Sequence, residues 1–342
     1  MILNQLGELG LLQRIRRRLP AGSNAVPIGI GDDAAVLRVP SGWDLIATTD
    51  MLVEGIDFNR AYGSTFPQIG YKALAVNLSD VAAMGGQPIA FLVGLAAPGS
   101  TAVRAVDEIY RGMRSLSRRH GVRLIGGDLS ASEKGLFITV TVLGRVETGR
   151  AVSRSGARVG DRLYVTGTLG DSRAGLEILK QLKRKNPLKQ RDFRSRLVRR
   201  HVFPAPRVAI GRWLGRTGWA TAMIDLSDGL ASDVRHLCVA SGIGARLELA
   251  RLPISDALRS YTKHAGRTPA EYALQGGEDF ELLFTVAKVR VAAFEPSAKK
   301  MGFRITRIGE IVQRRRGITM VERSGRETPL TFRGYEHFTH PE

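Results

Sequence analysis

Short apolar runs and a long helical period alternate along the first 150 residues of the chain. An amphipathic helix is predicted at 101–121, where TAVRAVDEIYRGMRSLSRRHG repeats apolar residues every three or four positions. Strands are predicted where short apolar runs lie between turn residues, at DLIATTD (44–50), PIAFLVGLA (88–96), VRLIGGD (122–128) and LFITVTVLGRV (136–146). This alternation is typical of an α/β domain.

The pattern changes near residue 150. A new unit begins with SRSGARVGDRLYVTG at 153–167, and a charged region rich in helical periods follows it to about residue 220. Further strands are predicted at TAMIDLSDG (221–229), ARLELA (245–250), FELLFTV (280–286), RITRIGEI (304–311) and GITMVE (317–322). We therefore expect an N-terminal domain over 1–149 and a C-terminal domain over 150–342.

Length and composition suit a protein with two ordinary cores, because the chain has 342 residues and 43% of them are hydrophobic. The first twenty residues carry their positive charges after a short apolar run, which predicts a helix rather than a signal peptide. No stretch approaches the ~18 apolar residues of a membrane span. Cys238 is the only cysteine, which excludes an internal disulfide and fits a reducing compartment. A cytoplasmic protein is expected.

Net charge is the strongest anomaly of the composition. The chain has 51 Lys and Arg against 32 Asp and Glu, a net charge of +19 that attracts polyanions. Basic residues cluster at 16–18, 180–201 and 314–316, but these clusters lack interleaved aromatic residues. Specific nucleic-acid binding is thus the less favoured alternative to solvated basic faces that attract an anionic nucleotide. We predict that 180–201 is such a surface and has no part in chemistry.

The first candidate for chemistry is IGIGDDAAVL at 28–37. A Gly-x-Gly-x-x-Ala turn suits a dinucleotide, whose pyrophosphate approaches bare backbone N–H groups, but Asp32 and Asp33 would repel it. A divalent cation between the acids and the phosphates would remove that conflict, because carboxylate oxygens bind Mg²⁺. A polar turn with a solvated acid pair explains the segment equally well.

Two later segments, NLSDVAAMG at 77–85 and DLSDGLASD at 225–233, share Leu-Ser-Asp before small residues. Ser-Asp suits a helix N-cap, so two capped helices are one explanation. However, TTD at 48–50 and GGD at 126–128 also end predicted strands in carboxylates. Acids that gather at strand ends repel each other unless cations bridge them, and strand ends are where α/β sheets bind ligands. Both explanations stay open.

Several other chemistries are excluded by inspection. The chain has no Walker G-x-x-x-x-G-K-[ST] motif and no His-Arg-Asp, and its DFE at 279–281 is not Asp-Phe-Gly. It also lacks the H-E-x-x-H motif of zinc proteases and the G-x-S-x-G motif of serine hydrolases. Walker ATPases, protein kinases and these two hydrolase classes are therefore disfavoured.

Seven motifs occur in a fixed order along the chain, namely GIGDDAAVL, TTDMLVEGIDF, YKALAVNLSDVAAMGGQP, LIGGD, SRSGARVGD, IDLSDGLASD and GGEDFELLFTV. This ordered set resembles the thiamine-monophosphate kinase family, a relative of aminoimidazole ribonucleotide synthetase and selenophosphate synthetase. The resemblance covers nearly the whole chain. It implies an α/β and α+β fold of the aminoimidazole ribonucleotide synthetase type. In that fold an N-terminal domain binds ATP and Mg²⁺ and pairs its mixed sheet across a homodimer, and an α+β C-terminal domain closes the nucleotide cleft.

The resemblance also implies roles for individual residues. Implied Mg²⁺ ligands are Asp33, Thr48, Thr49, Asp50, Asp80, Asp128, Asp225 and Asp228. Implied nucleotide contacts are Tyr110, Gly127, Asp128, Arg154 and Ser227, and implied substrate contacts are Asp57, Glu278 and Tyr335. The residues expected to matter most for catalysis are Asp33, Asp80, Asp128, Arg154 and Asp228. The role of Asp32 stays open.

The implied reaction is direct in-line transfer of the γ-phosphoryl group from ATP to thiamine monophosphate, giving thiamine diphosphate and ADP without a phosphoenzyme. The acceptor is already a phosphate monoester, so the main obstacle is the repulsion between two polyanions, which Mg²⁺ ions and Arg154 would reduce. Two positions depart from the family, which usually has His at Asp57 and Thr at Leu129. A carboxylate cannot donate to phosphate, although it can favour a cationic thiazolium. A related synthetase with another substrate is the alternative.

Overall fold

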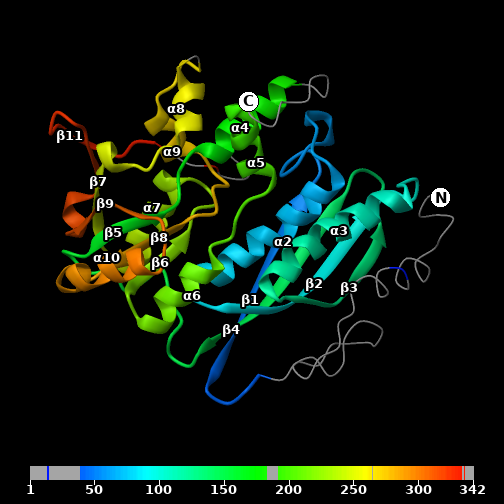
Figure 1. Ribbon diagram of the computed structural model, residues 1–342, viewed down its shortest axis with the longest axis horizontal. Helices are drawn as coiled ribbons and strands as arrows, with labels where there is room; N and C mark the ends of the chain where they lie inside the picture. The colour runs from blue at the N-terminus through cyan, green and yellow to red at the C-terminus, as the bar shows by residue number, and fades with distance from the viewer. Residues whose placement is uncertain (1–13, 15–38, 183–191, 264, 333–334, 336–342) are drawn as a thin grey trace. The chain divides into compact units, whose positions relative to one another are not determined.

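A computed structural model describes residues 14, 39–182, 192–263, 265–332 and 335 of the 342-residue chain (Figure 1). The chain forms two compact units. The N-terminal unit comprises Met1–Val81, Gly86–Gly149 and Leu182–Lys185, and the C-terminal unit comprises Ala82–Gly85, Arg150–Gln181 and Asn186–Glu342. Asp32, Asp33 and the helix expected in the first twenty residues, apart from Arg14, lie outside the described residues.

The N-terminal unit contains the strands and the helix that its apolar pattern predicts. Its elements are β1 (Trp43–Val53), the 3-10 helix η1 (Arg60–Tyr62), α2 (Phe66–Ala83), β2 (Gln87–Ala97), α3 (Val103–His120), β3 (Arg123–Ala131) and β4 (Phe137–Glu147). In the described residues these strands form a mixed sheet in the order β1-β4-β2-β3, in which only β2 and β3 are parallel. All four predicted strands and the predicted helix are confirmed.

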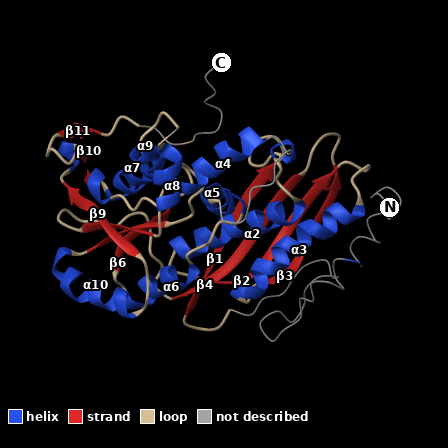
Figure 2. Ribbon diagram, turned by 45° about the horizontal axis from the view of Figure 1, so that its top comes forward, coloured by secondary structure: helices blue, strands red, loops and turns tan. Residues whose placement is uncertain are grey.

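Helices α2 and α3 lie side by side on one face of this sheet (Figures 1 and 2). The two helices approach each other so closely that a Cβ atom on Gly70 would clash with the carbonyl oxygen of Ile109, and one on Gly112 would clash with that of Pro67. Glycine at these two positions therefore sets the distance between the helix backbones. The packing fixes the side chains of α2 against the sheet.

The other face of the sheet exposes apolar side chains. Leu45 and Met51 alternate along β1 with the buried Ile46 and Leu52, and they leave 52% and 56% of their surface exposed. Alternation along a strand sends successive side chains to opposite faces, so these residues mark the face away from the helices. An apolar face of this kind is typical of an interface.

The C-terminal unit has more elements and a larger sheet. Its helices are α4 (Asp171–Leu182), α5 (Phe193–Val202), α6 (Val208–Thr217), α7 (Leu230–Ser241), η2 (Leu249–Arg251), α8 (Asp256–Thr262), α9 (Pro269–Gln275), η3 (Lys288–Arg290), α10 (Val291–Lys300) and η4 (Arg314–Arg316). Its strands are β5 (Arg162–Thr166), β6 (Ala220–Asp225), β7 (Gly244–Glu248), β8 (Leu282–Val286), β9 (Ile305–Val312), β10 (Ile318–Val321) and β11 (Glu327–Pro329).

The strands of this unit form a sheet in the order β11-β10-β7-β9-β5-β8-β6, in which β10 and β7 are the one parallel pair among the described residues. Leu163 and Val165 of β5 pack into an apolar cluster with Leu237 of α7. Between them Tyr164 faces the opposite side, where its ring lies 5.2 Å from that of Phe294 in α10. Both faces of the sheet are therefore covered, as in an α+β domain. No described helix is long and apolar enough to span a membrane.

The local predictions for the acidic segments were partly wrong. Asp80 lies inside α2 rather than at a helix start, and α7 begins after Gly229 without a side-chain cap from Ser227 or Asp228. Asp50 and Asp128 lie inside β1 and β3 rather than at their ends. The helix-cap explanation is therefore wrong for both Leu-Ser-Asp segments. In the first segment, packing against the sheet extends α2 well upstream of its Ser-Asp pair. In the second, α7 begins only after Gly229.

Candidate active site

An acidic cluster lies in the N-terminal unit between β1 and α2. We call Thr48, Asp50, Asp57 and Asp80 the N-terminal acidic cluster. Thr48 Oγ1 donates to Asp80 Oδ2 at 2.6 Å. Burial and then the negative charge of Asp80 raise the pKa of Asp50 to about 7, and the charge of Asp57 adds to this effect. Partly buried carboxylates that repel each other are a donor set that a divalent cation stabilises.

Asp57 belongs to this cluster through the turn that follows β1. Its Oδ2 accepts from the backbone N–H of Val53 at 2.7 Å, and its carbonyl oxygen accepts from Lys72 Nζ at 3.2 Å. Lys72 is buried in α2. The carboxylate at position 57 therefore has a structural partner that fixes the turn beside Asp50.

The structure does not bring Thr49 or Asp128 into this cluster. The Thr49 side chain lies on the opposite face of β1, where its Oγ1 accepts from Thr141 Oγ1 at 3.0 Å. The strand pairings place Gly127 of β3 level with Asp50 of β1, three strand spacings away. Neighbouring strands lie ~4.8 Å apart, so these two backbone positions are separated by roughly 14 Å. Asp128 is the next residue and is exposed. One Mg²⁺ cannot reach both carboxylates across that span of sheet, since its ligands lie at about 2 Å.

Gly127 and Tyr110, two predicted nucleotide contacts in this unit, are both constrained by close packing. A Cβ atom on Gly127 would clash with the carbonyl oxygen of Val93, so β3 approaches β2 there as only glycine allows. Tyr110 lies on the buried face of α3, and burial holds the pKa of its hydroxyl above the ordinary value. Its side chain is thus part of the core of the unit.

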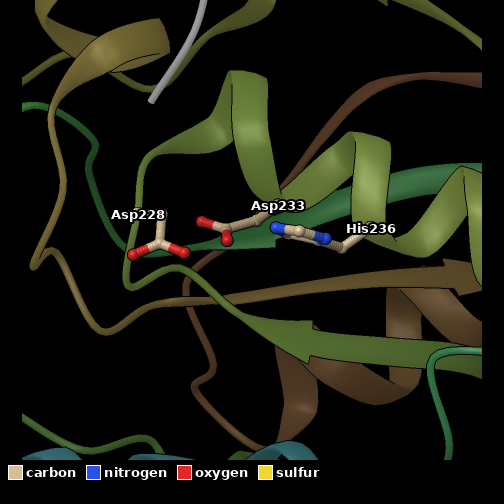
Figure 3. Close-up of side chains that lie close together, drawn as sticks. All are labelled: Asp228, Asp233 and His236. Carbon is tan, nitrogen blue, oxygen red and sulfur yellow. The ribbon is translucent and has the colours of Figure 1, made fainter. Parts of the chain in front are cut away.

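A second acidic cluster lies in the C-terminal unit, where β6 ends and α7 begins. We call Asp225, Asp228 and Asp233 the C-terminal acidic cluster. Asp228, Asp233 and His236 each offer a ligand atom, and these atoms lie within 4.8 Å of one another (Figure 3). Asp233 Oδ2 also accepts from the N–H of Gly229 at 3.1 Å. Burial and the charges of Asp225 and Asp228 raise the pKa of Asp233.

The segment GGEDFE at 276–281 runs beside this second cluster. The N–H of Glu278 donates to the carbonyl oxygen of Ser227 at 2.7 Å, and the N–H of Phe280 donates to that of Leu226 at 2.9 Å. Glu278 has φ 65°, a left-handed conformation that costs about 1–2 kcal/mol in a residue with a Cβ atom. The N–H of Tyr335 donates to the carbonyl oxygen of Asp228 at 2.9 Å. Ser227, Asp228, Glu278 and Tyr335 therefore lie together.

Arg154 is held through its backbone and presents an exposed side chain. Its carbonyl oxygen accepts from Ser241 Oγ at 2.9 Å. An exposed guanidinium can form two parallel hydrogen bonds with a phosphate group. The geometry of Arg154 is thus compatible with a phosphate contact.

Comparison with known proteins shows the relationships of the whole chain. Residues 31–146 match the N-terminal domain of AIR synthase related proteins, and residues 158–322 match the C-terminal domain. The thiamine-monophosphate kinase of Escherichia coli strain K12 is 39% identical over 341 residues, covering 98% of this chain and 99% of that protein. The chain belongs to the thiamine-monophosphate kinase family of AIR synthase related proteins.

Solved members of the thiamine-monophosphate kinase family share the fold. The enzyme from Stenotrophomonas maltophilia K279a has a TM-score of 0.80 and 36% identity, and the match covers 91% of this chain and 95% of that one. AaThiL complexed with AMPPCP and TMP has a TM-score of 0.77 and 36% identity over 99% of both chains. The expected two-domain fold of the aminoimidazole ribonucleotide synthetase type is confirmed.

Membership of the thiamine-monophosphate kinase family does not explain every group at the site. Asp233 and His236 lie beside Asp228 but were missed, although the i, i+3 spacing of an acid and a histidine after IDLSDG was a signal for them. His201 lies against Glu278, and Ser172 lies against His201. The sequence carries no signal for this pair, because the two residues come from separate helices.

The prediction that 180–201 is a solvated surface is wrong at the end of that stretch. Arg200 Nη2 lies 2.6 Å from the fully buried carboxylate of Glu281, and His201 is buried. Residues 183–191 lie outside the described part of the chain. The physical reason is that a charge pattern along a helix does not reveal buried acids on another element that need a cationic partner.

Proposed function

We infer that the protein is an ATP-dependent thiamine-monophosphate kinase, which transfers the γ-phosphoryl group of ATP to thiamine monophosphate and forms thiamine diphosphate and ADP. The similarity to thiamine-monophosphate kinases over nearly the full length of both chains carries this inference. The similarity to AaThiL complexed with AMPPCP and TMP supports both substrates.

The donor sets of both acidic clusters fit Mg²⁺, since they offer carboxylate and hydroxyl oxygens and carry unfavourable like charges. In the N-terminal cluster we propose Thr48, Asp50 and Asp80 as ligands, and in the C-terminal cluster Asp225 and Asp228. When bound, Mg²⁺ neutralises charge on the phosphates of ATP and of the acceptor. Ligand roles for Asp33, Thr49 and Asp128 stay predictions.

The remaining residues of the site would bind and orient the two substrates. The guanidinium of Arg154 is suited to the triphosphate, and Ser227 and Gly127 are proposed nucleotide contacts. Glu278, supported beside Ser227 by its backbone, is proposed to contact the acceptor together with Tyr335. The acceptor phosphate is itself the nucleophile, so these residues position the reactants rather than remove a proton.

We propose a homodimer that pairs through the exposed apolar face of the N-terminal sheet. Leu45, Met51 and Phe137 are exposed on or beside β1 and β4, and pairing of two such faces would remove them from water. A cytoplasmic location is proposed as well, because the free, buried Cys238 is compatible with a reducing compartment. Size-exclusion chromatography with light scattering measures the assembly.

Product identity tests the proposed function. The purified protein is incubated with ATP, Mg²⁺ and thiamine monophosphate, and the products are separated by chromatography. Thiamine diphosphate and ADP in equal amounts are expected. ADP formation without thiamine diphosphate, or ADP that appears only with a different acceptor, would instead support a related synthetase of the same fold.

A further inference from the structure

Three carboxylates occur within four residues of the GGEDFE segment, and each has a different environment. Glu281 is 0% exposed and lies against Arg200, Arg207 and the hydroxyl of Thr166. Asp279 is also buried and accepts from the backbone N–H of Gly170 and Ser172. These two acids are structural, because burial without partners would be costly.

Glu278 differs from its neighbours because 30% of its side chain is exposed. Its backbone is held in the left-handed region by the bond from its N–H to the carbonyl oxygen of Ser227. A strained backbone persists only where the surrounding structure determines it, and such positions concentrate at functional sites. Its accessible carboxylate is therefore held at a defined place beside Ser227 and Asp228.

A buried histidine lies against this carboxylate. His201 Nδ1 lies 3.2 Å from Glu278 Oε2 and 3.1 Å from Ser172 Oγ, and His201 is 5% exposed. A carboxylate only accepts hydrogen bonds, so the proton must lie on Nδ1 for His201 to bond Glu278. That proton is present both in the neutral Nδ1–H tautomer and in the imidazolium.

The position of His201 is itself tightly constrained. A Cβ atom on Gly175 of α4 would clash with the carbonyl oxygen of Leu197 in α5 and lie 3.1 Å from His201 Cβ. The two helices therefore touch backbone to backbone beside the histidine. In addition, Ser172 donates its N–H to Asp279 while its hydroxyl meets the imidazole. Helix α4, helix α5 and the GGEDFE segment form one connected support.

We propose that His201 is a positioning residue, which fixes the Glu278 carboxylate for contact with the cationic thiazolium ring of the phosphate acceptor. A carboxylate attracts a cation most strongly from one orientation, and a carboxylate that loses the imidazole beside it samples more rotamers and makes that contact less often. This inference rests on the proposed function, because it takes thiamine monophosphate as the acceptor.

Steady-state kinetics of two His201 variants test the proposal. His201→Leu removes the N–H donor, whereas His201→Asn keeps an N–H at the same number of bonds from Cα as Nδ1. A lost hydrogen bond to a charged group corresponds to roughly a tenfold or larger change, so His201→Leu should raise KM for thiamine monophosphate about tenfold. KM for ATP should change less than about twofold, and His201→Asn should recover most of the loss.

A double-mutant cycle with Glu278→Gln separates positioning from a general loss of structure. If His201 acts through Glu278, His201→Leu should have little further effect on that KM in the Glu278→Gln background. Equal effects in both backgrounds, or a parallel rise in KM for ATP, would overturn the proposal. If His201→Leu does not fold, His201→Gln, which moves the N–H one bond further from Cα, replaces it in the same cycle.

The wild-type protein distinguishes this inference from the function on which it rests. Wild-type protein that forms no thiamine diphosphate would overturn the proposed function. An active wild type together with an unchanged KM in His201→Leu would overturn only the positioning role.

Discussion

Thr48 donates its hydroxyl hydrogen to the carboxylate of Asp80 at 2.6 Å, across 32 positions of sequence. The bond connects β1 with α2 and occupies one oxygen of an acid that lies next to Asp50. A hydroxyl beside two carboxylates reduces their repulsion only in part, which is why the cluster is suited to a cation. Each Leu-Ser-Asp segment places one acid in a cluster of this kind, Asp80 in the first segment and Asp228 in the second.

Replacing Asp80 or Asp228 with Asn should abolish most turnover while leaving the fold intact. Each substitution removes one like charge from an acidic cluster, so the protein without Mg²⁺ should be no less stable, and stabilisation by Mg²⁺ and ATP should be lost. Thermal melts with and without Mg²⁺ and ATP measure this. Glu133→Gln, on an exposed loop, is the matched control. Near-normal turnover at low Mg²⁺ would rule out the metal role.

The raised pKa of Asp50 predicts a pH-dependent stability without metal. Its pKa is about 7 in the folded chain against an ordinary value of 3.8, so the folded state binds the proton more tightly. The contribution of this group is therefore fully present below about pH 4 and is lost as pH rises through about 7. Urea denaturation at pH 5 and pH 8 should show a smaller difference for Asp50→Asn than for wild type.

The affinity for Mg²⁺ should rise with pH, because the carboxylates that bind the ion must be deprotonated. If binding displaces one proton from Asp50, the apparent affinity should fall about tenfold for each pH unit below 7. Isothermal titration in buffers of different ionisation enthalpy counts the released protons. A proton count of zero in wild type at pH 6, where Asp50 is mostly protonated without metal, would separate Asp50 from the metal site.

The ion pair of Arg200 predicts a difference between two neighbouring arginines. Arg200→Gln leaves Glu281 buried with Arg207 as its remaining cation, and should lower the free energy of unfolding by about 1–3 kcal/mol. Arg199 is exposed, so Arg199→Gln removes the same charge with a change of less than about 0.5 kcal/mol. Urea denaturation of both variants makes the comparison. Equal effects would mean that the pair does not stabilise the fold.

The packing of α2 on α3 predicts that alanine is poorly tolerated at Gly70 and Gly112. A methyl group at either position meets a carbonyl oxygen of the other helix, and relief requires the backbones to move apart. Overpacking of this kind costs about 1–3 kcal/mol or more. Gly94→Ala is the control, because its nearest atom would be Thr139 Cβ at 3.7 Å. If chemical denaturation shows that Gly94→Ala is the least stable of the three variants, the close approach of α2 and α3 is contradicted.

The sequence predicts regular elements well and the environment of individual acids poorly. Strands β2 and β4 each contain an apolar run between turn residues, and this run is a strand of eleven residues in the fold. β11 has only three residues and offers no period, so it was not predicted. Asp80 lies inside a helix because tertiary packing outweighs the cap preference of Ser-Asp.

Long-range partners were equally invisible in the sequence. His201 and Glu278 lie 77 positions apart in the sequence, and neither segment contains a pattern that points to the other. Arg200 belongs to a run of basic residues whose other described members, such as Arg194, are exposed. A charge pattern cannot tell which member of such a run turns toward a buried acid.

Asp57 is the position at which the motif resemblance predicts His, and the structure gives its carboxylate two roles. It closes the turn by accepting from the N–H of Val53, and its charge adds to the raised pKa of Asp50. Asp57→Asn keeps an oxygen that can accept from Val53 and removes the charge. If position 57 faces the acceptor, this substitution should lower KM for thiamine monophosphate several-fold, because a carboxylate repels phosphate. KM for ATP should barely change.

Asp57→His tests the same position with the residue that the motif resemblance predicts there. An imidazole can donate to phosphate, so KM for thiamine monophosphate should fall by about tenfold, the equivalent of one hydrogen bond to a charged group. Loss of the turn bond should lower the free energy of unfolding by about 1 kcal/mol, which Asp57→Asn should largely avoid. If Asp57 instead binds Mg²⁺ or the thiazolium, both substitutions should weaken the enzyme, and a changed Mg²⁺ dependence would identify the metal role. If the kinetics are unchanged in both variants, Asp57 has no role in substrate binding and serves to close the turn that follows β1.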